Sequence, residues 1–150
     1  MPDDVTDEEA LLLGDILSTA FFCAEQGGVS PGDTVAVVGL GPVGLLAVIA
    51  ARHLGASKVI AVEGVEGRRS KAAEFGAKAV APEAAGAAVA AATEGRGADV
   101  VLEAVGASGA LRLAFELVRP AGTVSSVGVH TAQGWPFTPV DAYNKTATFR

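Results

Sequence analysis

Short apolar runs rich in β-branched residues recur along the chain. They lack the polar alternation of a strand with one solvent face, as the sequence TVAVV at residues 34–38 illustrates. Continuous apolar runs of this length are typical of strands that are buried on both faces, as in a parallel sheet. The pattern predicts strands over residues 34–38, 58–62, 78–81, 99–102, 123–127 and 146–149.

Segments of helical character separate these runs. They span residues 16–25, 43–54, 67–75, 84–93 and 109–118, and several of them end at a glycine. Thr6 and Glu9 have the spacing of a capping box, which predicts a further helix near the start of the chain. Residues 128–140 carry glycine and proline breakers and are predicted to form a loop. Strands that alternate with helices predict a parallel sheet with right-handed crossovers and helices on both faces.

The composition narrows the class of protein. A chain of 150 residues has the usual size of one domain, and 50% hydrophobic with 19% charged residues excludes intrinsic disorder over the whole chain. The formal net charge of -6 is opposite to the basic face of a nucleic-acid-binding module. No apolar run approaches the ~20 residues of a membrane span, and the acidic residues 1–4 do not resemble a secretory signal. We therefore predict a cytoplasmic protein that binds neither nucleic acid nor membrane.

The single cysteine, Cys23, permits no intramolecular disulfide and no cysteine-based zinc site within this chain. This favours a reducing compartment. We interpret Cys23 as a small buried apolar group.

The motif with the clearest chemistry is the sequence GLGPVG at residues 39–44. It follows a predicted buried strand and opens a predicted helix, which is the context of dinucleotide binding. Gly39 would allow a tight turn, Gly41 a close approach of the backbone to a pyrophosphate, and Gly44 close packing of the helix on the sheet. Pro42 fits the first helical turn, whose free N–H groups favour phosphate. The alternative is an ordinary strand–turn–helix junction, but the combined context favours a dinucleotide.

Glu63 comes at the end of the next predicted strand, nineteen positions beyond Gly44. A carboxylate there can accept hydrogen bonds from both hydroxyls of the adenine ribose, and it would repel a 2′-phosphate. This favours NAD over NADP. Arg68 and Arg69 leave the alternative open, because an arginine can contact a 2′-phosphate instead. We interpret Arg68 as lying against the adenosine ribose.

These segments, with GDILST at residues 14–19 and GRGADVVLEAVG at residues 95–106, resemble the cofactor domain of the medium-chain dehydrogenase/reductase family, specifically the zinc-type alcohol dehydrogenases. The resemblance covers essentially the whole chain. It implies a Rossmann-type, doubly wound α/β fold with a six-stranded parallel sheet. The family's GroES-like catalytic barrel and its Gly-His-Glu segment do not occur in residues 1–150, which we expect to form a single dinucleotide-binding domain.

The resemblance also implies roles for individual residues. Asp15 matches the third protein ligand of the catalytic zinc, whose other ligands lie on the barrel; the alternative is a helix N-cap or turn residue. Thr19 matches a threonine near the nicotinamide, Val105 and Gly106 the loop beside the nicotinamide ribose, and residues 127–129 the backbone that meets the carboxamide. The expected cofactor-binding residues are Thr19, Gly39, Leu40, Gly41, Pro42, Val43, Gly44, Glu63, Gly64, Arg68, Val105, Gly106, Val127, Gly128 and Val129.

Two functions remain open at this point. The resemblance implies the NAD(H)-binding domain of a zinc-dependent alcohol dehydrogenase-like oxidoreductase, with zinc bound only in a full-length protein; the alternative is a nucleotide-binding module without activity. The resemblance further implies a homodimer that pairs its sheets edge to edge near residues 128–140. His130 is either a substrate-rim or a plain loop residue, His53 is interpreted as a solvated helix end, and Trp135 as a loop plug or subunit contact.

Overall fold

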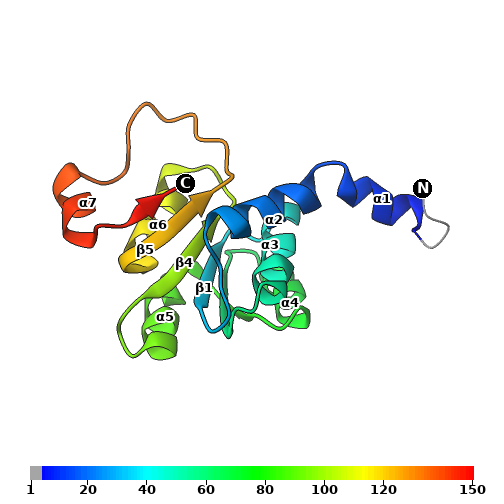
Figure 1. Ribbon diagram of the computed structural model, residues 1–150, viewed down its shortest axis with the longest axis horizontal. Coiled ribbons are helices and arrows are strands. Elements are labelled where there is room, and N and C mark those ends of the chain that lie inside the picture. Colours follow the sequence, from blue (N-terminus) through cyan, green and yellow to red (C-terminus); the bar gives the residue numbers. More distant parts are fainter. Residues whose placement is uncertain (1–4) are drawn as a thin grey trace.

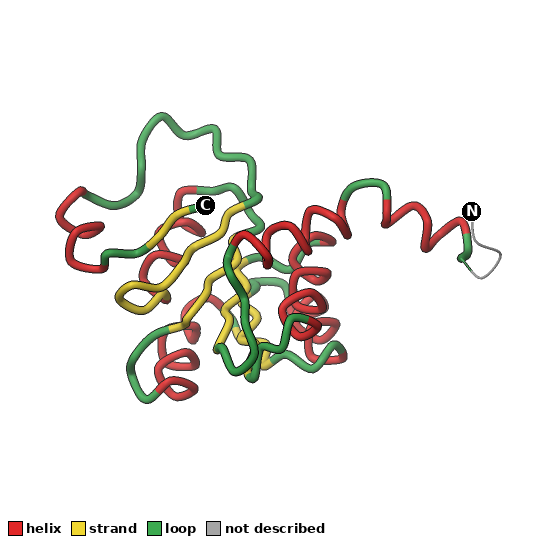
Figure 2. Tube along the Cα trace, in the orientation of Figure 1, coloured by secondary structure: helices red, strands yellow, loops and turns green. Residues whose placement is uncertain are grey.

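The computed structural model describes residues 5–150. The acidic residues 1–4, on which the prediction about a secretory signal rests, lie outside the described residues. Helices and strands alternate along most of the chain (Figure 2). The strands are β1 (Thr34–Val38), β2 (Lys58–Val62), β3 (Lys78–Val80), β4 (Ala98–Glu103), β5 (Val118–Ser126) and β6 (Thr148–Phe149). The helices are α1 (Asp7–Leu13), α2 (Ile16–Gln26), α3 (Pro42–His53), α4 (Glu66–Glu74), the 3-10 turn η1 (Pro82–Ala84), α5 (Ala85–Thr93), α6 (Ser108–Leu117) and α7 (Pro139–Lys145).

The six strands form one sheet in the order β3-β2-β1-β4-β5-β6. Every pair is parallel; Val35 of β1 lies opposite Val59 of β2 on one side and opposite Val100 of β4 on the other. The strand order therefore reverses at β1, which is the topological switch point of a doubly wound sheet. The predicted six-stranded parallel sheet of Rossmann type is confirmed.

Successive residues of β1 enter two different cores, one on each face of the sheet. Val35 and Val37 pack with residues of α2, α3 and α4, whereas Ala36 and Val38 pack with residues of α5 and α6. All five residues of β1 are buried. The absence of polar alternation in the sequence thus follows from helices on both faces, as Figure 1 shows.

The C-terminal region differs from the prediction. Residues 139–145, for which no helix was predicted, form α7, which begins with a capping box between Thr138 and Asp141. The ammonium group of Lys145 donates hydrogen bonds to the carbonyls of Phe115, Glu116 and Val118 at 2.8, 2.8 and 2.6 Å, so it ties α7 to the end of α6.

Strand β5 also begins earlier than predicted, at Val118 rather than at residue 123. Val118 pairs with Ala98, after which the register shifts so that Thr123 pairs with Val100. The residues of β5 between these two pairs include Pro120 and Ala121, the latter at φ 54°.

Helix α1 extends away from the sheet, and none of its residues is buried (Figure 1). Leu11, Leu12 and Leu13 are exposed on it, as is Phe22 on α2. None of the helices within residues 5–150 combines the length and the apolar character needed to cross a membrane.

Candidate functional site

The glycine-rich turn joins the carboxyl end of β1 to α3, and its three glycines have different reasons to be glycine. Gly39 has φ +88°, and a Cβ there would overlap the side chain of Val105. A Cβ on Gly44 would overlap the carbonyl oxygen of Gly39. A Cβ on Gly41, in contrast, would have no atom within 4 Å. Gly39 and Gly44 are therefore required by internal packing, whereas Gly41 faces open space.

Gly41 is also the N-cap of α3, and Pro42 occupies the first helical turn. Because glycine has no side chain to accept hydrogen bonds, the first amides of this twelve-residue helix receive no side-chain cap. The N-terminal backbone of α3 and the open face of Gly41 therefore lie together at the carboxyl end of β1, an arrangement that favours an anion.

Glu63 reaches from the end of β2 to this turn. Its Oε2 accepts a hydrogen bond from the amide of Leu40 at 3.0 Å, and its Oε1 accepts one from the amide of Val65 at 3.1 Å. Burial of the side chain, which is 12% exposed, opposes ionisation, but the two amides and the Arg68 guanidinium outweigh it, so the pKa of Glu63 lies below its usual value. Glu63 is thus held as a carboxylate beside the glycine-rich turn.

The two arginines that follow Glu63 behave differently. Arg69 Nη1 donates to the carbonyls of Glu63 and Gly64 at 2.8 and 2.7 Å, so its guanidinium is engaged by the backbone. Arg68 Nη1 lies 3.4 Å from Glu63 Oε2, and its side chain is 53% exposed. Of the two, Arg68 is the more exposed, and it is held by its contact with the Glu63 carboxylate.

A groove of about 470 Å³ lies at the carboxyl ends of β1 and β2, where open α/β sheets bind ligands. Six predicted residues line it: Gly39, Gly41, Glu63, Gly64, Arg68 and Val105. The remaining lining is mainly apolar and comes from β1, β2, the loop after β4, the first two turns of α6 and the turn at Pro82. The other predicted residues do not line this groove: Leu40, Pro42, Val43 and Gly44 belong to the glycine-rich turn and the start of α3, and Thr19, Gly106, Val127, Gly128 and Val129 lie outside it.

Two loops at the ends of β4 and β5 pack backbone against backbone beside the groove. Gly106 has φ +81°, and a Cβ there would lie 2.6 Å from the backbone nitrogen of Val129; a Cβ on Gly128 would overlap the amide of Gly106. The structure therefore brings the predicted residues 105–106 and 127–129 into one contact.

A carboxylate that was not among the predicted site residues, Glu103, anchors these loops. It is the last residue of β4 and 0% exposed. Its Oε1 accepts from the amides of Val105 and Gly106, both at 2.8 Å, and its Oε2 accepts from the hydroxyl of Ser126 at 2.6 Å. A glutamate that ends a buried apolar strand is the signal in the sequence that could have identified it, because a buried carboxylate needs several donors.

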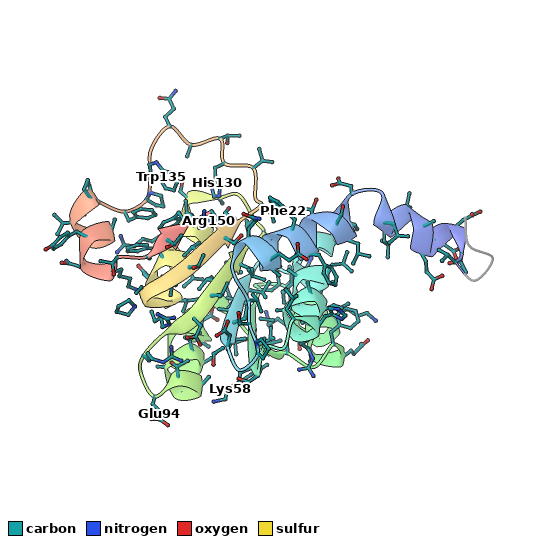
Figure 3. All side chains as sticks on the ribbon, viewed as in Figure 1. Phe22, Lys58, Glu94, His130, Trp135 and Arg150 are labelled. Atoms are coloured by element: carbon teal, nitrogen blue, oxygen red, sulfur yellow. The ribbon has the colours of Figure 1, made fainter. Side chains whose placement is uncertain are left out.

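His130 joins the same carboxylate. Its Nε2 lies 3.1 Å from Glu103 Oε2 and 3.0 Å from Ser126 Oγ. His130 also lines a separate hollow of about 370 Å³ with Trp135 and Arg150, and the three labelled side chains lie in one corner of the molecule (Figure 3). Trp135 is 67% exposed and packs against Phe137 and Phe149.

The remaining candidates stand apart from the groove. Asp15 occupies the N-cap position of α2, and its Oδ1 accepts a hydrogen bond from the Thr19 hydroxyl at 3.0 Å. Within residues 5–150 no three His, Cys, Asp or Glu side chains come together as a metal site. Asp15 alone does not fit zinc, which needs three or four protein ligands.

Cys23 is buried, and its thiol lies 3.5 Å from the carbonyl oxygen of Ser125, to which it donates. Burial raises the pKa of the Cys23 thiol to about 11. Its predicted role as a small buried group is confirmed. His53 is exposed and packs edge-on against Phe21.

Fold and glycine-rich turn together define a nucleotide-binding domain of the dehydrogenase type. The family model described as "Zinc-binding dehydrogenase" matches residues 42–150, and the chain belongs to this family. Over 150 residues it is 44% identical to "Probable zinc-binding alcohol dehydrogenase Rv1895" of Mycobacterium tuberculosis. The alignment covers 100% of this chain and 39% of that relative.

Solved structures agree with this assignment. Alcohol dehydrogenase TADH from Thermus sp. ATN1 superimposes with a TM-score of 0.94 at 45% identity, covering 100% of this chain and 44% of that one. A structure from Sinorhizobium meliloti, described as a zinc-binding dehydrogenase bound to NADP, matches 89% of this chain and 41% of its own, with a TM-score of 0.79 at 32% identity. The chain thus spans about two fifths of the length of these relatives and corresponds to their nucleotide-binding fold.

Proposed function

We propose that this chain binds NAD(H) in the groove between β1, β2 and the loop after β4, as the cofactor domain of a zinc-dependent alcohol dehydrogenase-like oxidoreductase. One observation carries the proposal. The backbone at Gly41 faces open space at the N-terminus of α3, while Gly39 and Gly44 hold the turn and the helix together by contacts that no side chain permits. This is the physical requirement for a pyrophosphate that lies directly on the backbone.

The proposed residues divide along the length of the dinucleotide. Glu63, Gly64 and Arg68 would contact the adenosine half. The turn and the first helical residues, Gly39, Leu40, Gly41, Pro42, Val43 and Gly44, would hold the pyrophosphate. Thr19, Val105, Gly106, Val127, Gly128 and Val129 would surround the nicotinamide half.

A substitution at Gly41 tests the assignment of the glycine-rich turn to the pyrophosphate. Gly41→Val adds a side chain into open space, so the fold should be retained while NADH binding, measured by NADH fluorescence, falls at least a hundredfold because the side chain occupies the place of the pyrophosphate. Gly86→Val is the matched control, since a Cβ at Gly86 on α5 also meets no atom within 4 Å and Gly86 does not line the groove. A Gly41→Val variant that binds NADH as tightly as the parent would contradict the assignment.

The preference for NAD over NADP rests on Glu63. Its carboxylate is fixed by two amides, so it cannot swing away from a 2′-phosphate without losing both hydrogen bonds. Without the carboxylate, the exposed Arg68 favours NADP, because a guanidinium attracts the 2′-phosphate. Glu63→Ser should therefore reduce or reverse the preference for NADH over NADPH. A parent protein that binds NADPH more tightly than NADH would overturn this preference and assign Arg68 to the phosphate.

Catalysis is proposed only for a protein that also carries a barrel. Within the described residues Asp15 is the one candidate zinc ligand, and the metal is needed as a Lewis acid for the developing alkoxide. The nicotinamide supplies the hydride chemistry, and this chain's residues orient the cofactor. The 150-residue chain should therefore bind NAD(H) without oxidising a primary alcohol in the presence of added zinc; measured turnover would refute this.

The proposed assembly is a homodimer paired through the edge strand β6, in a cytoplasmic location. In the structure β6 pairs with β5 on one side, which leaves its other edge as a template for pairing. Light scattering at increasing concentration tests the dimer, and a strictly monomeric species would contradict it.

A further inference from the structure

Glu103 and His130 form a polar cluster that the glycine-rich turn does not explain. The cluster connects the ends of two neighbouring strands: Glu103 ends β4, Ser126 ends β5, and His130 belongs to the loop that follows β5. All four hydrogen-bond partners of the buried carboxylate come from these two loop regions.

The hydrogen positions in this cluster follow from the chemistry of its members. The Ser126 hydroxyl has one hydrogen, which it donates to Glu103 Oε2, so its oxygen is left to accept. A carboxylate also accepts. Because His130 Nε2 faces both of these acceptors, at 3.1 and 3.0 Å, it must carry a proton.

The hydrogen bonds of Glu103 fix the loop after β4 relative to the loop after β5. The amides of Val105 and Gly106 are fixed by one carboxylate oxygen, and His130 and Ser126 are fixed by the other. Gly106 and Gly128 touch without side chains between them. The separation of the two loops is therefore set at one buried group, and close-packed backbone transmits a shift of either loop to the other.

We propose that Glu103 and His130 are positioning residues that clasp the loop after β4 to the loop after β5 and so shape the nicotinamide end of the site. The inference rests on the proposed function, because it assigns those two loops to the nicotinamide half of the dinucleotide. His130 acts here as a donor to Glu103, and through that carboxylate it positions the two loops.

The first measurement needs no cofactor. His130→Leu removes the donor, and amide hydrogen exchange at Val105, Gly106 and residues 127–130 should accelerate at least tenfold, while exchange in β1 and α3 stays as in the parent. His130→Gln places an amide N–H near the position of Nε2 and should restore most of the protection. His53→Leu, the same change at the chain's other histidine, is the matched control.

The second measurement separates the two halves of the ligand. ADP carries the adenosine and both phosphates but no nicotinamide riboside. His130→Leu should weaken NADH binding about tenfold and change the affinity for ADP by less than twofold. A loss of general stability would weaken both ligands equally and would overturn the positioning role.

The outcomes distinguish the clasp from the proposal on which it rests. If the parent binds both ligands and His130→Leu matches it in exchange and in affinity, the clasp is refuted and the dinucleotide site stands. If the parent binds neither ADP nor NADH, the dinucleotide proposal fails and the nicotinamide role of the clasp fails with it.

Discussion

Replacing Gly44 with alanine tests how closely α3 is set against the glycine-rich turn. A Cβ at this position would overlap the carbonyl oxygen of Gly39 and lie 2.8 Å from its carbonyl carbon. Both atoms belong to the backbone, so no side chain can rotate away. The first turn of α3 must move off the turn that holds it, and the buried residues Ala47 and Val48 on the same helix must move with it.

The expected cost can be assembled from two opposing effects. Overpacking a close-packed region costs about 1–3 kcal/mol, and an overlap between backbone atoms belongs at the upper end of that range. Alanine regains about 1 kcal/mol over glycine inside a helix. The net destabilisation is about 2 kcal/mol, which lowers the melting temperature by roughly 4–8 °C for a chain of this size.

Gly41→Ala is the matched control three positions away. Gly41 has φ -66°, which alanine adopts freely, and its Cβ would meet no atom within 4 Å. Its free energy of unfolding should stay within about 0.5 kcal/mol of the parent, because a small entropic gain and a poorer N-cap oppose each other. Thermal and urea unfolding followed by circular dichroism measure both variants. If Gly44→Ala is as stable as Gly41→Ala, the packing argument for the glycine-rich turn is wrong.

Three further predictions concern regions outside the groove. The side chains of Arg96 and Arg119 and the amide of Thr34 donate hydrogen bonds to Asp99, and these donors hold the pKa of Asp99 well below its usual value despite burial. The resulting stabilisation is complete above pH ~5 and is lost progressively as the pH falls. Asp99→Asn should therefore flatten the fall in melting temperature between pH 5 and pH 2.5, and an unchanged slope would exclude Asp99 as the source of that fall. Cys23, with its pKa raised to about 11 and its side chain buried, should react with a thiol reagent at pH 8 at least a hundredfold more slowly in the native protein than in urea; equal rates would show that the site opens freely. Lys145→Met leaves three carbonyls at the end of α6 without their donor and should cost about 1–3 kcal/mol and accelerate amide exchange in α7, whereas Lys71→Met, at an exposed pair on α4, should change stability by less than about 0.5 kcal/mol.

Local pattern was sufficient for most of the fold because the sheet is buried on both faces. A strand such as β1 has no solvent-facing positions, so its sequence is apolar throughout and distinct from the helices around it. Helix α7 was missed because it is short and follows a segment with several breakers, although Thr138, Pro139 and Asp141 carry the signs of a helix start. The early start of β5 depends on pairing with Ala98 across a register shift, and a tertiary irregularity of this kind leaves no periodic signal.

A site residue could be predicted from the sequence where its role depends only on its own short segment. The glycine-rich turn is such a segment, and its spacing placed Gly39, Gly41 and Gly44 correctly in the strand–turn–helix junction. Glu103 could not be predicted from its own segment, because its role depends on donors that lie 2 to 27 positions away along the chain and come together only in the folded sheet. The same is true of His130, because its partner Glu103 lies at the end of β4, 27 positions earlier in the chain.

The place of β1 at the centre of the sheet has a kinetic consequence. Val35 pairs with Val59 of β2, 24 positions on, but also with Val100 of β4, 65 positions on. Closing the longer loop costs about 0.9 kcal/mol more in free energy than closing the shorter one, because more chain entropy is lost. The half of the sheet made of β1, β2 and β3 can therefore form before β4, β5 and β6 dock onto it. Val105, which follows β4, lies against Gly39 and lines the groove with it. The groove is therefore complete only when the two halves of the sheet have docked. During refolding, the ability to capture a nucleotide would appear with the final docking of the halves, after most of the helical signal has already returned.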